Sequence, residues 1–305
     1  MIEIAQGTRV YGLQLPIQAQ VTTYVAEWER TAGPSGLARV AQAADDGGFF
    51  YVGVCDHVAI PDELAPEMGT YWSDCIATLA WLAPQTTRVN LLSHVYVLPY
   101  RHPAIAAKAF STLDHLSGGR VICGIGAGHI VREFELLGAD YEHRGGVVAA
   151  KVPELINGLE HEVVADGFGA TPRPAQSPRP PVWIGGSSPA AIKRAGRLAD
   201  GWLPQGPSDD AMVQLLEITR EKAGRADLPM AIGHITPSLY VGTPDWDVGA
   251  ATITGSPQEV ADRILAGAPA LANQFQIRFK SRTLEEQCDQ MAAFGAEVAP
   301  LIERI

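Results

Sequence analysis

The fold of this chain is decided by residues 89–145, which read VNLLSHVYVLPYRHPAIAAKAFSTLDHLSGGRVICGIGAGHIVREFELLGADYEHRG. The apolar run at 89–95 is typical of a buried strand, and the alanine-rich segment 104–116 is typical of a helix. A second apolar run, 121–125, leads directly into the glycine-rich segment 126–128, where a ligand could approach the backbone closely. A strand, a crossover helix and a strand in this order predict a parallel sheet that is buried on both faces.

The composition indicates a globular protein with a large buried core. The 305 residues are 47% hydrophobic and 19% charged, which is enough apolar material for a large core. The formal charge of −11 argues against nucleic acid or an anionic membrane as the main partner. No apolar stretch reaches the roughly 18 residues of a spanning helix, and no secretory signal is visible at the N-terminus. We therefore expect a cytoplasmic protein.

Strand-like runs alternate with helical patterns along the whole chain. Strands are predicted at 10–15, 49–54, 89–95, 121–125, 181–184, 201–203, 230–235 and 275–279. Helices are predicted at 36–44, 74–83, 104–116, 131–137, 147–159, 189–198, 209–223, 257–265 and 284–294. About eight strand–helix units are the count of a TIM (β/α)8 barrel, so we expect a single α/β domain over residues 1–305. A doubly wound sheet shares the alternation, usually with fewer strands, and is the alternative.

Histidines follow three of the predicted strands. In a TIM barrel the functional groups lie at the carboxyl ends of the strands, and these ends carry His57, His94 and His129. Imidazole titrates close to neutrality, so it suits proton transfer or hydrogen bonding to a redox ring. A single histidine is more often a packed core residue, but three at the strand ends of one barrel favour a functional site.

A second candidate site follows the strand predicted at 181–184. Gly185, Gly186, Ser187 and Ser188 stand before a proline at a plausible first helical position. Backbone N–H groups and hydroxyls at a helix N-terminus can bind phosphate. The same residues would equally form a serine N-cap after a tight turn. The segment 124–128 is also ambiguous, because its glycine spacing is not GxGxxG.

Other charged and reactive residues are interpreted as structural. Arg132 and Glu133, followed by Arg144, are predicted to form an ion pair on a helix surface or within the structure. The four cysteines show no CxxC and no metal spacing, so no metal centre is expected. No GxSxG elbow is present, which argues against a hydrolase triad.

At these residues the chain resembles the luciferase-like monooxygenase superfamily, in particular its actinobacterial F420-dependent oxidoreductases. The shared segments cover nearly the whole chain and include 56–57, 98–120, 124–129, 132–145, 178–186, 195–204 and 255–264. The resemblance implies a luciferase-like TIM barrel with inserted segments in its βα loops. It also implies that a flavin or deazaflavin ring lies across the mouth of the barrel.

The resemblance implies roles for individual residues as well. His57 would give or take a proton beside the ring, and His129 is a second acid/base candidate. A bulge with a non-proline cis peptide behind the ring maps onto Ser93, His94 and Val95. The other cofactor contacts implied are Asp56, Ala127, Gly128, Gly185, Gly186, Ser187 and Ser188. Position 129 is a histidine where the sugar-phosphate-oxidising deazaflavin enzymes have a catalytic glutamate, which argues against that substrate.

Three functions fit this interpretation. The first is hydride transfer between coenzyme F420 and a small organic substrate, and the second is an FMN-dependent monooxygenase supplied by a separate flavin reductase. The third is a catalytically silent barrel that binds a flavin-like ligand. The lactyl-oligoglutamate tail of F420 prefers a basic groove, for which the candidates are Arg101, Lys193, Arg194 and Arg197. Dimers are common in the family, so a homodimer is expected.

Overall fold

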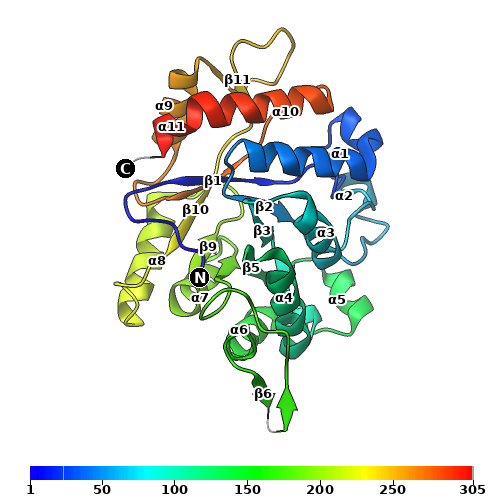
Figure 1. Ribbon diagram of the computed structural model, residues 1–305, viewed down its shortest axis with the longest axis vertical. Helices are drawn as coiled ribbons and strands as arrows, with labels where there is room; N and C mark the ends of the chain where they lie inside the picture. Colours follow the sequence, from blue (N-terminus) through cyan, green and yellow to red (C-terminus); the bar gives the residue numbers. More distant parts are fainter. Residues whose placement is uncertain (23, 166, 304–305) are drawn as a thin grey trace.

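The computed structural model describes residues 1–22, 24–165 and 167–303, and a closed barrel of parallel strands forms its centre (Figure 1). Within these residues the barrel strands are β1 (Val10–Gln14), β2 (Tyr51–Val54), β3 (Asn90–Ser93), β5 (Val121–Gly126), β8 (Val182–Gly185), β9 (Gly201–Leu203), β10 (Ala231–Ile235) and β13 (Gln274–Ile277). Each strand pairs in parallel with its neighbours in chain order, and β13 returns to β1. The TIM barrel is confirmed, because a doubly wound sheet would stay open.

A helix follows each barrel strand and covers its outer face. These helices are α1 (Glu27–Asp46), α3 (Cys75–Leu82), α4 (Pro103–Ser117), α6 (Arg144–Glu160), α7 (Pro189–Leu198), α8 (Asp210–Lys222), α9 (Pro257–Gly267) and α10 (Leu284–Ala293). Figure 1 shows α10 beside α1, so the first and last units close the ring together. None of the described helices is long and apolar enough to cross a membrane.

Short elements lie in the connections between these units, apart from α11, which follows α10. They are α2 (Ala65–Met68), β4 (Tyr96–Val97), α5 (Val131–Leu137), β6 (Val163–Ala165), β7 (Phe168–Gly169), β11 (Leu239–Val241), β12 (Ile253–Gly255) and α11 (Ala299–Ile302). The hairpin of β6 and β7 projects from the end of the molecule opposite α10 and α11 (Figure 1). Several of the others follow barrel strands at their carboxyl ends, where they surround the mouth of the barrel.

Two helices differ from their predicted bounds. The helix predicted at 36–44 belongs to α1, which begins at Glu27 and changes direction at Gly33 (φ 61°), just before Pro34. Proline has no N–H to donate, so the helical pattern in the sequence is interrupted there. The last helix was predicted to end at Phe294, but a π-helical turn (Phe294–Val298) carries it on into α11. The wider turn shifts the apolar periodicity, so the 3.6-residue pattern stops at that point.

Inside the barrel, large inward-facing side chains are followed by glycines nearer the carboxyl ends of the strands. The rings of Tyr51 and Trp183 pack edge to face with centroids 6.0 Å apart, and Tyr51 Oη donates to Gln274 Oε1 at 2.8 Å. Side chains alternate between the two faces of a strand. Glycines occupy the next inward positions on four strands, at Gly53, Gly124, Gly185 and Gly233. Neighbouring atoms take the place of a side chain there, since a Cβ on Gly124 would lie 1.9 Å from the Ser93 carbonyl oxygen and one on Gly233 would lie 2.5 Å from Pro204 Cδ. Glycine therefore lets the segments at the carboxyl end pack closely over the barrel.

Candidate functional site

A cavity of about 660 Å³ lies at the carboxyl end of the barrel, and all eight barrel strands contribute residues at or just beyond their ends. The predicted site residues that line it are Asp56, His57, His94, Val95, Ala127, Gly128, His129, Gly185, Gly186, Ser187 and Ser188. Ser93 is placed differently, because it is fully buried and its Oγ donates to the Gly124 carbonyl at 2.9 Å. The structure therefore brings together every predicted site residue except Ser93.

His57 is held by a buried glutamate that the sequence interpretation missed. His57 Nδ1 lies 3.0 Å from Glu133 Oε2, and the Glu133 side chain has no exposed surface. The same carboxylate accepts hydrogen bonds from the backbone N–H groups of Val58 and Ala59 and from Tyr100 Oη at 2.8 Å. Burial opposes the charged form, yet these hydrogen bonds lower the pKa of Glu133 to about 2. Glu133 is therefore an anion at neutral pH.

The contact with Glu133 fixes the tautomer of neutral His57. An ionised carboxylate only accepts, so the ring hydrogen must lie on Nδ1, and Nε2 is left as an acceptor. The ring packs edge to face against Trp72 and His129, with centroids 4.4 and 5.4 Å apart, and both of these residues line the cavity. Burial and the nearby His57 lower the pKa of His129, so its ring is neutral at pH 7. The cavity therefore contains an imidazole nitrogen that can accept a proton.

The predicted ion pair between Glu133 and a neighbouring arginine is wrong. Arg132 contacts Glu63 and Glu135 on the surface, and the Arg144 guanidinium packs over the Tyr141 ring at 3.9 Å. Glu133 lies in the first turn of α5, which follows the glycine-rich end of β5. That position beside a strand end was the signal in the sequence that could have placed Glu133 in the site.

Asp56 lines the cavity, but its carboxylate forms hydrogen bonds with the loop after β3 and so fixes that loop. It accepts from Arg101 Nη2 at 2.8 Å and from the Val97 backbone N–H at 2.7 Å. Arg101, a candidate for the basic groove, is thus paired and does not line the cavity. Of the other three candidates, Lys193 and Arg197 are exposed and only Arg194 reaches the cavity.

The loop after β3 forms an apolar wall of the cavity. The peptide bond between His94 and Val95 is cis, as the resemblance implied. A Cβ on Gly126 would lie 2.3 Å from Val95 Cγ2, and one on Gly185 would lie 3.0 Å from Val95 Cγ1, so glycine is needed at Gly126. His94 Nε2 is buried and has no hydrogen-bond partner in the described part of the chain. Burial lowers the pKa of His94 to about 4, so the ring is neutral. An apolar wall beside an unsatisfied nitrogen suits a planar ring with a polar edge.

The turn after β8 keeps only some of its predicted donors for an anion, because the Gly186 N–H donates to the Leu203 carbonyl and the Ser187 hydroxyl to the Gln205 carbonyl. Ser188 is the N-cap of α7, and its Oγ accepts from the Ala191 N–H at 3.3 Å. Arg194 lies on the same helix, is 7% exposed and lines the cavity, and it makes no ion pair with the described residues. A helix N-terminus beside a buried guanidinium that lacks a counterion suits a phosphate group. The N-cap and the phosphate interpretations are therefore compatible.

The comparison with known proteins agrees with this geometry. Residues 11–242, well over half of the chain, match the family described as luciferase-like monooxygenase. The chain belongs to this family. Among solved structures of the same fold, monooxygenase RslO1 from Streptomyces bottropensis has a TM-score of 0.74 at 22% identity, with 95% of this chain and 99% of that chain covered. The coenzyme F420 dependent tetrahydromethanopterin reductase from Methanopyrus kandleri has a TM-score of 0.73 at 20% identity, with 96% and 99% covered.

Curated relatives of this family member include F420-dependent dehydrogenases. The chain is 35% identical to F420-dependent glucose-6-phosphate dehydrogenase of Nakamurella multipartita over 217 residues, which is 63% of this chain and 60% of that protein. It is 31% identical to F420-dependent hydroxymycolic acid dehydrogenase of Mycobacterium tuberculosis over 180 residues, 55% of this chain and 48% of that protein. The chain thus matches less than two thirds of the length of either relative.

Proposed function

We propose that this protein is an oxidoreductase that transfers a hydride between coenzyme F420 and a small organic substrate. The observation that carries the proposal is one cavity in which His57, oriented by Glu133, lies with an anion-binding turn and Arg194. The apolar wall at Val95 and the unsatisfied His94 Nε2 fit a planar ring with hydrogen-bonding edges. The F420-dependent relatives support the same cofactor.

Different residues of the cavity would have different roles in such a reaction. Coenzyme F420, when bound, supplies the carrier of the two electrons that move as hydride. An alcohol that loses hydride from carbon also loses a proton from oxygen, and His57 Nε2 would accept that proton or return it to a carbonyl in the reverse direction. The Glu133 carboxylate stabilises the imidazolium that forms. Met68 and Trp72 line the same cavity and limit the access of water.

The substrate is proposed to differ from glucose 6-phosphate. The glutamate expected of the sugar-phosphate-oxidising enzymes is His129 in this chain. His129 is a neutral ring packed on His57, so it lacks the charge of a glutamate. His129 thus differs from a glutamate in charge and in proton affinity beside the reacting atoms, so we expect a different substrate.

Titration of the purified apoprotein with F420 and, separately, with FMN tests the cofactor. We expect F420 to bind, and Arg194→Met to weaken this binding at least about tenfold, because a hydrogen bond to a charged group contributes roughly 1.5–3 kcal/mol. Arg197→Met is the matched control, since Arg197 is exposed on the same helix and does not line the cavity. The change in cofactor fluorescence gives the dissociation constant.

Two results would replace this proposal. Tight FMN binding without F420 binding would favour the two-component monooxygenase that receives reduced FMN from a separate reductase. A protein that binds F420 but reduces or oxidises no member of a broad substrate panel would favour the silent, ligand-binding barrel.

A further inference from the structure

One wall of the cavity is a chain of neutral polar groups on three adjacent strands. Gln276 of β13, Gln14 of β1 and Cys55 after β2 all line the cavity. Gln276 Nε2 donates to Gln14 Oε1 at 3.3 Å, and Gln14 Nε2 donates to Cys55 Sγ at 2.9 Å. The hydrogen bonds orient both amides, so these three residues form a fixed surface, called here the amide–thiol wall.

The wall has hydrogen-bonding capacity left for a ligand. Each amide nitrogen carries two hydrogens and uses one of them in the chain. Behind the wall, Gln18 Oε1 accepts from the Cys55 N–H at 3.3 Å, while Gln18 Nε2 has no partner among the described residues, although Gln18 is only 1% exposed. Gln18 is not part of the cavity lining, so it supports the wall from behind. The hydrogens that a ligand can reach are the second amide hydrogens of Gln14 and Gln276, which both line the cavity.

The wall is uncharged, in contrast to the side of the cavity that carries arginines. Burial raises the pKa of the Cys55 thiol to about 11, so the thiol is neutral at physiological pH. Arg144 and Arg194 line the cavity from α6 and α7, which follow other strands. Arg278 lies in an adjoining pocket that Gln14 and Gln276 also line, and there its guanidinium packs over the Tyr24 ring at 4.9 Å. Arg278 is absent from the lining of the cavity itself, so an anionic group placed there against the neutral amides would lose hydration without pairing with a guanidinium.

We propose that the amide–thiol wall is the substrate subsite and that it selects uncharged hydroxyl or carbonyl compounds over phosphorylated or carboxylated ones. The inference rests on the proposed function for the chemistry at His57, which follows Cys55 by two residues. The substrate oxygen accepts from the free amide hydrogens of the wall. The arginine side of the cavity is left for the anionic part of the cofactor.

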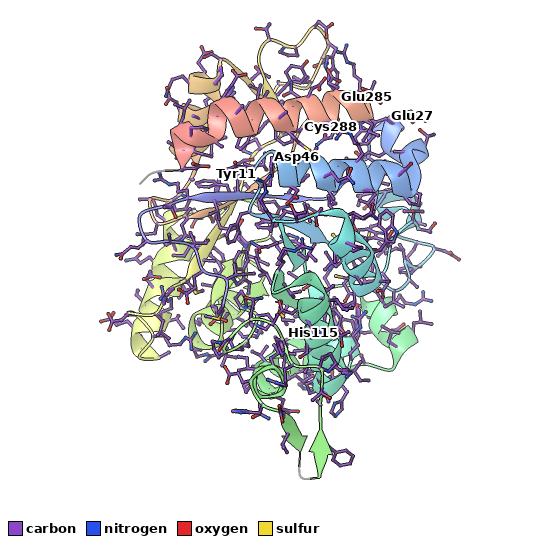
Figure 2. The ribbon with its side chains drawn as sticks, in the orientation of Figure 1. Tyr11, Glu27, Asp46, His115, Glu285 and Cys288 are labelled. Atoms are coloured by element: carbon purple, nitrogen blue, oxygen red, sulfur yellow. The ribbon has the colours of Figure 1, made fainter. Side chains whose placement is uncertain are left out.

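The thiol of Cys55 gives a measurement that needs no cofactor. Cys55 is partly exposed, whereas Cys75, Cys123 and Cys288 are buried, and Figure 2 places Cys288 on α10 in the outer helical layer. At about pH 9, where a small fraction of the Cys55 thiol is ionised, we expect iodoacetamide to alkylate Cys55 of the full chain before Cys75 and Cys123, which line no pocket of the described residues, as followed by mass spectrometry of tryptic peptides. Uncharged alcohols and ketones should slow this reaction at concentrations at least tenfold lower than the carboxylate or phosphate ester of the same carbon skeleton.

Substitution within the wall tests its part in the selection. Gln276→Glu keeps the shape but adds a charge, and it should weaken the protection by uncharged compounds at least fivefold. Gln214→Glu adds the same charge on the exposed face of α8 and should leave the protection unchanged. Circular dichroism confirms that each variant is folded.

Three results would overturn the inference. One is equal alkylation of all four cysteines, and another is protection by none of the uncharged compounds. The third is stronger protection by the anionic compounds. If Arg278→Gln then removed this protection, an anionic substrate would be assigned to the neighbouring pocket. The F420 titration is independent of these measurements. A protein that fails to bind F420 but retains protection by neutral compounds would contradict the proposed function alone.

Discussion

His57→Ala is expected to lower the turnover of F420 with any accepted substrate by about 100- to 10,000-fold, the range of a lost general acid or base. The dissociation constant of F420 should change by less than about threefold, because the turn proposed to bind phosphate and Arg194 lie on a different strand–helix unit. His57 supplies the acceptor nitrogen in the cavity that Glu133 orients. Stopped-flow absorbance of the deazaflavin measures turnover, and a fluorescence titration measures binding.

His115→Ala is the matched control for this substitution. His115 is an exposed histidine in the last turn of α4, and Figure 2 shows it on the helical layer. It should leave both turnover and binding unchanged. Equal turnover in His57→Ala and the wild type would remove the proton-transfer role. An equal loss of binding and turnover would make His57 a cofactor ligand instead.

The gathering of the histidines at the mouth follows from the topology. Parallel strands buried on both faces give apolar runs that the sequence displays directly, and their carboxyl ends must meet at one end of the barrel. The placement of His57, His94 and His129 in one cavity could therefore be predicted without any contact being known. Side chains alternate between the two faces of β3, so Ser93 and His94 point in opposite directions. Ser93 could therefore have been left out of the predicted site.

The partners of these residues could not be predicted in the same way. Glu133 is 76 residues from His57 along the chain, and their contact depends on how the short helix α5 lies over the loop after β2. Asp56 and Arg101 likewise meet through the fold of the loop after β3. Charge patterns along the sequence favour local pairs three or four residues apart, such as Arg132 with Glu135, but burial in the folded chain selects the donors to Glu133 from distant segments.

Glu133→Gln is expected to destabilise the protein by about 3 kcal/mol at pH 7. The pKa of Glu133 falls from its usual 4.5 to about 2 on folding, and each unit of difference corresponds to about 1.4 kcal/mol. A group whose pKa is lowered in the folded state stabilises that state fully above its unfolded pKa. The stabilisation should therefore be complete above pH 4.5 and should disappear as the pH falls towards 2. The glutamine variant lacks this titration, so the difference between the two proteins should shrink across that range.

Urea denaturation of both proteins at several pH values between 3 and 7 measures this difference. Glu135→Gln is the control, because Glu135 lies on the same helix in a surface ion pair with Arg132, and its loss should change stability by less than about 1 kcal/mol. A constant difference between wild type and Glu133→Gln at every pH would show that the carboxylate does not carry the stabilisation. Glu133→Asp keeps the charge on a shorter side chain, so it should restore part of both the stability and the turnover. Glu133→Gln preserves the volume but not the charge, whereas Glu133→Asp preserves the charge but not the volume. Partial rescue by aspartate would therefore show that the charge orients His57, and that loss of packing alone does not explain the effect of glutamine.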